Sequence, residues 1–149
     1  LGNGDGTFQA ARSYPTGGFS DGFAVGDFDS DGKLDLVSAD ASGNNISIFT
    51  GPGDGSFSTR KQFSTGTGPV AIATADFDGD GDLDLATANY YDGTVTVLAG
   101  KGDGTFGPSH AYETQTSPVT IVTADFNQEG KPDLVSLAGS GWLSLLVAQ

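Results

Sequence analysis

The sequence contains no cysteine and no methionine, which excludes disulfide bonds and thiolate metal sites. It has only 6 lysine and arginine residues against 19 aspartate and glutamate residues, and its formal net charge is −13. A nucleic-acid partner is therefore not expected, because phosphate binding needs a basic surface. No apolar run is long enough to span a membrane. No segment repeats its apolar residues at helical spacing over three turns, so helices are not expected either.

Glycine and short apolar runs are what the sequence has in quantity, with 24 glycines among 149 residues. The apolar runs are bounded by Gly, Asp, Asn and Ser, which is typical of short strands joined by tight turns. The 10 phenylalanines argue against a disordered chain. The sequence opens at Leu1 in the middle of a repeat, without an initiator methionine or a signal peptide. We therefore expect a processed protein, a fragment or an engineered chain.

Two motifs recur at one fixed spacing. Asp27, Asp76 and Asp125 open the segments DFDSDGKLD, DFDGDGDLD and DFNQEGKPD, which are 49 residues apart (76 − 27 and 125 − 76). The second motif, GDGTF or GDGSF, occupies residues 4–8, 53–57 and 102–106, again with a step of 49 residues. Three copies of one unit therefore cover almost the whole chain.

Each copy is expected to form four short strands. The first leads into the acidic segment (23–26, 72–75 and 121–124) and the second leaves it (34–39, 83–88 and 132–137). The third follows at 46–50, 94–99 and 143–148, and the fourth runs from the motif phenylalanine over 8–14, 57–63 and 106–112. Four-stranded units in tandem predict an all-β fold of β-propeller blades. A β-solenoid is the alternative, but its coils are usually shorter.

The chain, residues 1–149, is thus interpreted as a three-blade propeller unit. Blades are predicted at 19–65, 68–114 and 117–149, the last without its own outer strand, while 1–16 is a spare outer strand for the last blade of the same or a partner chain. Propellers have typically 4–8 blades. We therefore expect half of a six-bladed ring, closed as a homodimer with exchanged N-terminal strands. Membership in a longer propeller explains the same pattern.

The acidic segments have the oxygen spacing of a calcium loop. Side-chain oxygens recur at positions 1, 3, 5 and 9, a glycine follows position 5, and the carbonyl of position 7 is expected to point inward. Calcium takes 6–8 oxygens, whereas magnesium needs a stricter geometry and zinc and copper prefer softer ligands. Up to three ions per chain are predicted, with three sets of ligands: Asp27, Asp29, Asp31, Lys33 and Asp35; Asp76, Asp78, Asp80, Asp82 and Asp84; and Asp125, Asn127, Glu129, Lys131 and Asp133.

The third loop is expected to bind its ion most weakly. Asn127 removes one charge, Glu129 is longer than aspartate, and Gln128 replaces the Ser30 or Gly79 of the other loops. Clustered carboxylates repel one another without a cation, and three divalent ions would change the net charge from −13 to −7. The alternative is that these segments are only Asp/Gly turns between strands, which three copies in fixed register disfavour.

Other residues offer no clear catalytic site. His110 is the one histidine, on a predicted edge strand, so no His-based catalytic or zinc site is expected within one chain. A glycosidase pair of carboxylates is disfavoured because every acidic cluster has metal spacing. The loops on the face opposite the acidic segments carry Tyr90, Tyr91 and Trp142. These aromatics are candidates for binding a protein or a glycan, and the alternative is that they pack over neighbouring blades.

The acidic loops after an apolar strand, the LDL or PDL that follows each, and the L-x-G-x-GDGTF stretch at 98–106 resemble the FG-GAP/VCBS repeat family, known from integrin α-subunit propellers. The resemblance covers the whole chain. It implies β-propeller blades with calcium in the acidic loops, and extracellular or cell-surface proteins used for adhesion rather than catalysis. We therefore expect a non-enzymatic, calcium-binding scaffold or interaction module. The alternatives are a lectin that uses the loop aromatics and a fragment of a larger adhesion protein.

Overall fold

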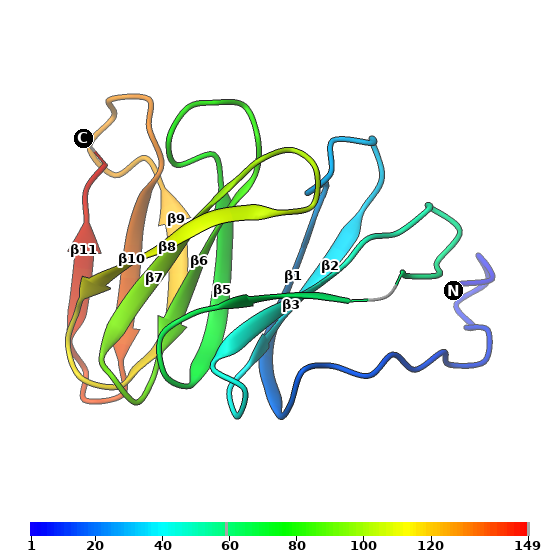
Figure 1. Ribbon diagram of the computed structural model, residues 1–149, viewed down its shortest axis with the longest axis horizontal. Coiled ribbons are helices and arrows are strands. Elements are labelled where there is room, and N and C mark those ends of the chain that lie inside the picture. Colours follow the sequence, from blue (N-terminus) through cyan, green and yellow to red (C-terminus); the bar gives the residue numbers. More distant parts are fainter. Residues whose placement is uncertain (59, 149) are drawn as a thin grey trace.

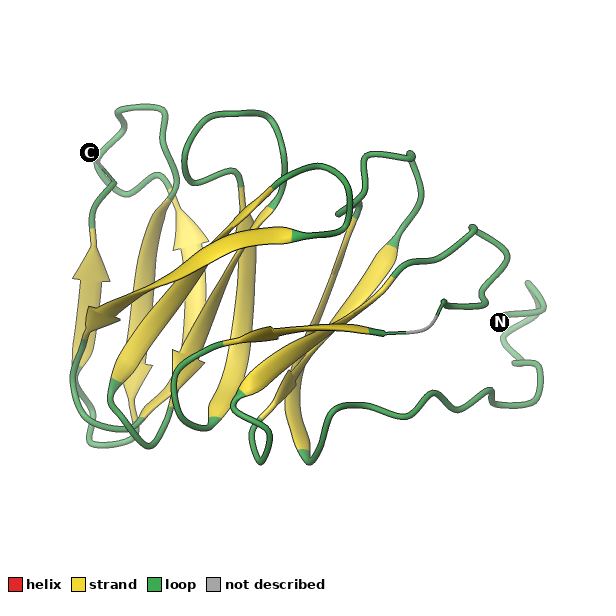
Figure 2. Ribbon diagram, viewed as in Figure 1, coloured by secondary structure: helices red, strands yellow, loops and turns green. Residues whose placement is uncertain are grey.

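The computed structural model describes residues 1–58 and 60–148 of the chain. Thr59, in the predicted strand 57–63, and Gln149, in the predicted third blade, lie outside the described residues. The described part consists of strands and loops (Figure 2), so the predicted all-β class is confirmed. It includes no helix of the length and apolarity that crossing a membrane requires.

The described strands form three antiparallel sheets in chain order. The first sheet contains β1 (Ser20–Gly26), β2 (Asp35–Asp40), β3 (Asn45–Phe49) and β4 (Lys61–Ser64). The second contains β5 (Pro69–Ala75), β6 (Asp84–Asn89), β7 (Thr94–Gly100) and β8 (Phe106–Glu113). The third contains β9 (Pro118–Ala124), β10 (Asp133–Ala138) and β11 (Leu143–Leu146). Each sheet is a meander, as tight Gly-rich turns between short apolar runs favour. We call the sheets blades one, two and three.

The three blades stand side by side in a row, with blade two in the middle (Figure 1). Their first strands β1, β5 and β9 pack against one another in series. The first inter-blade core joins Phe28, Val37, Ile46 and Ile48 of blade one to Leu85, Leu98 and Phe106 of blade two. The second joins Ala73, Ala86, Ala88 and Val95 of blade two to Ile121 and Leu134 of blade three. Each blade thus buries its apolar side chains against a neighbouring blade and not within itself.

The two outer faces of the row are apolar and exposed. Blade one exposes Phe23, Val25 and Leu34 on the side away from blade two. Blade three exposes a larger set on the side away from blade two: Val122, Phe126, Leu137 and Leu143. The first strands of the end blades, β1 and β9, are therefore exposed on one face, because burial on both faces requires a neighbouring blade on both sides.

The fourth strand of each copy is the least well predicted element. In the third motif copy it is present as β8, and in the second it is shortened to β4. Residues 9–16 form no strand, and Phe8 makes one isolated bridge with Gly2. The predicted strand 8–14 is thus wrong for a single chain, since an outer strand needs the edge of a sheet to pair with, and residues 9–16 have none.

The third blade also has a β10–β11 turn that is shorter by a single position. Ser38 pairs with Ser47 in blade one, and Thr87 pairs with Thr96 at the equivalent place in blade two. In blade three Ser136 pairs with Ser144, although the repeat alone would place its partner at position 145. Ser144 is therefore the equivalent of Thr96, and it lies one residue closer to Thr96 than the 49-residue repeat would place it. The sequence did not reveal this, because no motif follows β11 to mark the shift.

Candidate metal centres

Each acidic segment connects the first and second strands of its blade, and all three segments lie at the same end of their blades (Figure 1). Two positions in each segment have a positive φ angle. Position 4 is Ser30 (56°), Gly79 (82°) or Gln128 (63°), and position 6 is Gly32 (81°), Gly81 (95°) or Gly130 (89°). Glycine adopts this backbone region without a steric penalty, whereas serine and glutamine adopt it at a steric cost. The two left-handed residues turn the segment back on itself, so that residues before and after them face each other.

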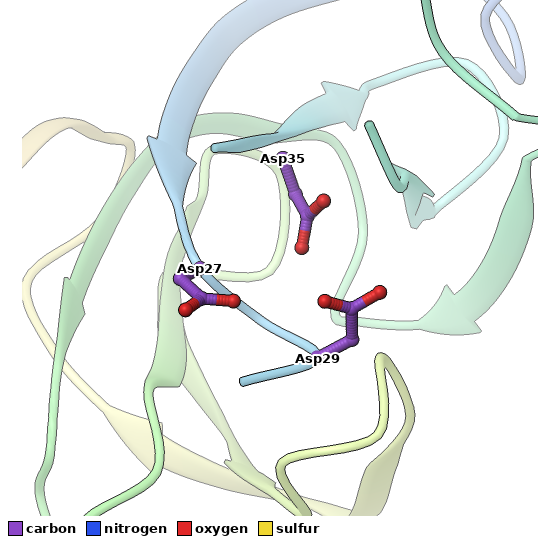
Figure 3. A group of neighbouring side chains, drawn as sticks. All are labelled: Asp27, Asp29 and Asp35. Carbon is purple, nitrogen blue, oxygen red and sulfur yellow. The ribbon is translucent and has the colours of Figure 1, made fainter. Parts of the chain in front are cut away.

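The first segment brings three of its predicted ligands together. One carboxylate oxygen each from Asp27, Asp29 and Asp35 lies within 4.8 Å of the others, and the three side chains surround a common space (Figure 3). Oδ1 of Asp29 is buried and has no hydrogen-bond partner among the described residues. Burial raises the pKa of Asp29, and the charges of Asp35, Asp31 and Asp27 raise it further. A buried, unpaired carboxylate oxygen facing two other carboxylates fits a bound cation.

The second segment forms the same arrangement from Asp76, Asp78 and Asp84, with one oxygen of each again within 4.8 Å of the others. It differs from the first in exposure, because Asp78 is exposed whereas Asp29 is half-buried. Burial raises the pKa of Asp84, against the lowering effect of the Gly100 and Phe77 N–H groups, and Asp78 and Asp80 raise it further. The two triads are therefore alike in geometry but unequal in shielding from water.

The ninth-position aspartate has a second role that the spacing of the acidic residues did not indicate. Asp35 accepts hydrogen bonds from the N–H groups of Phe28 and Gly51, both at 2.9 Å. Asp84 does the same with Phe77 at 2.6 Å and Gly100 at 2.7 Å. Each carboxylate thereby ties the acidic segment to the end of the third strand. The available signal was a glycine that recurs at one fixed distance after the aspartate, in the first two copies of the repeat.

Two of the predicted ligands in each of these segments lie outside the triads. Asp31 forms an ion pair with Lys33 at 2.9 Å, and the hydrogen bond from Lys33 lowers the pKa of Asp31. Asp80 accepts a hydrogen bond from the N–H of Asp82. The Asp82 side chain accepts one from Ser30 Oγ of blade one at 3.2 Å. The position-7 carbonyls of Lys33 and Asp82 stay predicted ligands.

The third segment does not bring three carboxylates together in the described part of the chain. Asp133 is buried and accepts hydrogen bonds from Phe126 at 3.0 Å and Ala148 at 2.9 Å, like its counterparts. Asp125, Asn127 and Glu129 are exposed, and Lys131 is exposed as well. Occupancy of this loop stays a prediction.

A turn of the neighbouring blade covers the first triad. The N–H of Gly104 in the β7–β8 turn of blade two donates a hydrogen bond of 2.8 Å to the carbonyl of Phe28, and Lys61 Nζ reaches the carbonyl of Gly104 at 3.5 Å. A Cβ on Gly104 would lie 3.5 Å from Asp29 Cβ, which places this turn against the triad. The equivalent covering turn is not present over the second triad in the described residues. This explains why Asp29 is more buried than Asp78.

The Gly-Asp-Gly turns themselves serve a structural role. Asp5, Asp54 and Asp103 each accept hydrogen bonds from both the backbone N–H and the side-chain hydroxyl of the residue two positions on. These hydrogen bonds, the side-chain one foremost, lower the pKa of all three aspartates. The turn interpretation of these residues therefore agrees with the structure.

The predicted aromatic ligand-binding residues are exposed at the opposite ends of the blades. Tyr90 and Tyr91 lie in the β6–β7 turn and contact each other edge to face, with ring centroids 5.2 Å apart. Trp142 lies in the corresponding β10–β11 turn of blade three. Whether they bind a protein or a glycan stays a prediction.

Comparison with known proteins bears on the repeat and its acidic loops. No curated protein matches the sequence. A family model described as an FG-GAP-like repeat matches twice, over residues 27–87 and 76–136. The two matches begin at the first aspartate of the first and second acidic segments, and together they cover most of the chain. The chain belongs to the FG-GAP-like repeat family.

Proposed function

We propose that this chain is a non-enzymatic, calcium-binding β-propeller scaffold or interaction module that acts outside the cell or at the cell surface. The observation that carries the proposal is the triad of Asp27, Asp29 and Asp35, in which a buried oxygen of Asp29 lacks a hydrogen-bond partner. A cation supplies the missing partner and neutralises the mutual repulsion of the carboxylates. FG-GAP-like repeats are generally scaffold or adhesion modules, which supports the non-enzymatic, extracellular assignment.

Calcium is the preferred ion because every available ligand is an oxygen. Aspartate carboxylates and backbone carbonyls at adaptable positions suit its 6–8 ligands at 2.3–2.6 Å. The hydrogen bonds that Asp27 and Asp35 accept from the backbone leave lone pairs free for an ion. The second site uses Asp76, Asp78 and Asp84. The third loop offers Asp125, Asn127, Glu129 and Asp133 as the weakest site.

Calcium is expected to stabilise the fold. Two sites saturated at 100 times their Kd add about 2.7 kcal/mol each, which corresponds to roughly 5 to 10 °C in Tm per site for a chain of this size. Differential scanning calorimetry with chelator and with added calcium measures the shift, and native mass spectrometry counts the ions. An identical Tm in both buffers, with no retained metal, would refute the calcium sites.

Asp29→Asn is expected to act in opposite directions in the two buffers. Because the folded-state pKa of Asp29 is raised, its charged form costs stability once the pH rises through that pKa. In the metal-free protein at neutral pH, the neutral amide should therefore raise the free energy of unfolding by about 1 kcal/mol. With calcium present the variant should lose most of the stabilisation at one site.

The matched control is Asp21→Asn, which removes the same charge from an exposed position on β1. Urea unfolding of each variant with and without calcium gives the four free energies required. A loss of stability in metal-free Asp29→Asn would mean that Asp29 has a structural role instead of a ligand role.

The scaffold closes as a ring of six blades built from two copies. The blades are residues 19–65, 68–114 and 117–149, and residues 1–16 supply the outer strand of the partner's third blade. Blades one and three expose apolar residues on their far sides. The equivalent faces of neighbouring blades are buried in the inter-blade cores, which supports this assembly. The exposed face of blade one and that of blade three each need a neighbouring blade. In a two-copy ring, blade three of the second copy covers blade one, and blade one of the second copy covers blade three.

A further inference from the structure

A pocket of about 740 Å³, lined by mainly apolar residue types, lies open between blades two and three. It is not part of either acidic triad, and nothing in the described residues fills it. Its walls come from the acidic segment, β7 and β8 of blade two, and from β10 and β11 of blade three with their flanking residues. The lining residues are Phe77, Val97, Tyr112, Pro132, Leu134, Leu145, Leu146, Val147 and Ala148.

The equivalent space between blades one and two is filled by Phe106. This side chain is only 6% exposed and belongs to the first inter-blade core. Its ring contacts Phe63 edge to face at a centroid distance of 5.2 Å and Phe28 at 6.1 Å. Leu85 and Leu98 complete the same core.

The repeat maps these neighbours onto the walls of the open pocket. A shift by one repeat takes Phe28 to Phe77, Phe63 to Tyr112 and Leu85 to Leu134. Because the turn before β11 is one residue shorter, the equivalent of Leu98 in blade three is Leu146, which pairs with Leu134 as Leu98 pairs with Leu85. All four of these residues line the pocket. The pocket is therefore the site that Phe106 occupies, repeated one blade further on without its phenylalanine.

Phe8 is the most exposed of the three motif phenylalanines, at 80%, whereas Phe57 is half-buried and Phe106 is buried. The segment of Phe8 lies along blade one, where Arg60 donates to the carbonyls of Pro15 and Thr16 and Tyr14 contacts Phe57 at 5.4 Å. The pocket lies between blades two and three, and blade two stands in the middle of the row, between blade one and blade three (Figure 1). Phe8 therefore cannot reach the pocket of its own chain in this arrangement.

We propose that Phe8 of a second copy fills the pocket between blades two and three, and that residues 8–15 of that copy pair with β11 as its outer strand. This inference rests on the proposed two-copy ring and specifies its contacts. In blade two, Tyr112 lies opposite Val95 and His110 opposite Val97. The same register places Tyr14 of the second copy opposite Leu143, and Arg12 opposite Leu145. Both leucines are exposed in a single chain.

The same mapping assigns a contact to the N-terminal Gly-Asp-Gly turn. The N–H of Gly104 donates to the carbonyl of Phe28 in the existing inter-blade contact. Gly6 corresponds to Gly104, and Phe77 corresponds to Phe28. The turn of the second copy thus covers the acidic segment of blade two, as Gly104 covers that of blade one.

Truncating Phe8 is expected to weaken the dimer. Loss of a central aromatic anchor at each of two identical contacts should raise the dimer dissociation constant at least about a hundredfold. Sedimentation equilibrium of the full chain measures it for wild type, Phe8→Ala and the control Tyr91→Ala. Tyr91 is 74% exposed and lies on the opposite end of the blades. A wild-type mass of one 15.1 kDa chain at all concentrations, or an equal effect of both variants, overturns the proposal.

Engineered disulfides test the register, because the chain has no native cysteine. Residues directly opposite on antiparallel strands have Cβ atoms about 4.5–5.5 Å apart, near the range that a disulfide bridges. Tyr14→Cys with Leu143→Cys should give a covalent dimer on oxidation. Tyr14→Cys with Val147→Cys, which is out of register, should not. Equal cross-linking of both pairs, or a disulfide within one chain, overturns the proposed pairing.

Calcium dependence separates this proposal from the proposed function. If calcium changes neither Tm nor mass but the Tyr14–Leu143 pair cross-links, the calcium function fails and the strand exchange stands. If calcium binds and stabilises a chain that is monomeric and does not cross-link, the strand exchange fails and the calcium function stands. Circular dichroism of each variant confirms that the blades are folded before either result is interpreted.

Discussion

Replacing Asp84 by alanine is expected to lower the free energy of unfolding of the metal-free protein by about 2 to 6 kcal/mol. Alanine leaves two buried N–H donors unpaired, and each unpaired donor costs about 1–3 kcal/mol. Asp84 is 1% exposed, and its two oxygens accept the N–H groups of Phe77 at 2.6 Å and Gly100 at 2.7 Å. Against a typical total stability of roughly 5–15 kcal/mol, this loss is large enough to unfold a marginal chain.

Urea unfolding in the presence of chelator isolates this structural role from any metal contribution. Asp84→Asn should fall between wild type and alanine, because the amide keeps one acceptor oxygen and replaces the other with a donor. The control is Asp80→Ala, which removes an exposed carboxylate from the same segment. If Asp84→Ala and Asp80→Ala cost the same, the buried hydrogen bonds do not hold the blade together.

Phe106→Ala is expected to cost about 3–5 kcal/mol, in line with other large-to-small substitutions of buried aromatic side chains. Its ring is packed between Phe28 and Phe63, both of blade one, in the core that joins the first two blades. The substitution leaves blades one and two separated by a cavity similar to the open pocket between blades two and three. We expect the two blades to lose cooperativity as well as stability.

Phe19→Ala is the matched control, since Phe19 is exposed and makes its hydrogen bond to Ser42 through its backbone. Thermal and urea unfolding, each followed by far-ultraviolet circular dichroism, give the free energy and the sharpness of the transition. A Phe106→Ala variant as stable as Phe19→Ala would mean that the inter-blade core is not the main source of stability.

Local patterns were sufficient to predict the first three strands of each copy and their grouping. The constant spacing between Asp27, Asp76 and Asp125 identified three equivalent units, and short apolar runs between Gly-rich turns predicted the antiparallel meander of each sheet. The acidic triads were predictable for the same reason. Asp27, Asp29 and Asp35 lie in one short segment, so their meeting depends on one turn and not on the rest of the fold.

Contacts between blades could not be predicted, because they join residues far apart in the chain. Ser30 meets Asp82, and Gly104 meets Phe28, through the packing of one blade on the next. The turn that holds Gly104 makes the first triad more buried than the second, although the two segments are nearly identical in sequence. The shorter turn of blade three also had no marker, and it became visible only from the pairing of Ser136 with Ser144.

The sequence by itself determined the repeated unit, its all-β class and the spacing of its acidic oxygens, since these follow from residue patterns within one blade. The tertiary structure alone decided which of the two acidic triads is shielded from water. It also decided that the ninth-position aspartates hold the backbone and that the pocket beside β11 lacks the phenylalanine that Phe106 supplies one blade earlier. The physical reason is that burial is a property of neighbouring blades, and a single repeat carries no information about which of its faces is covered.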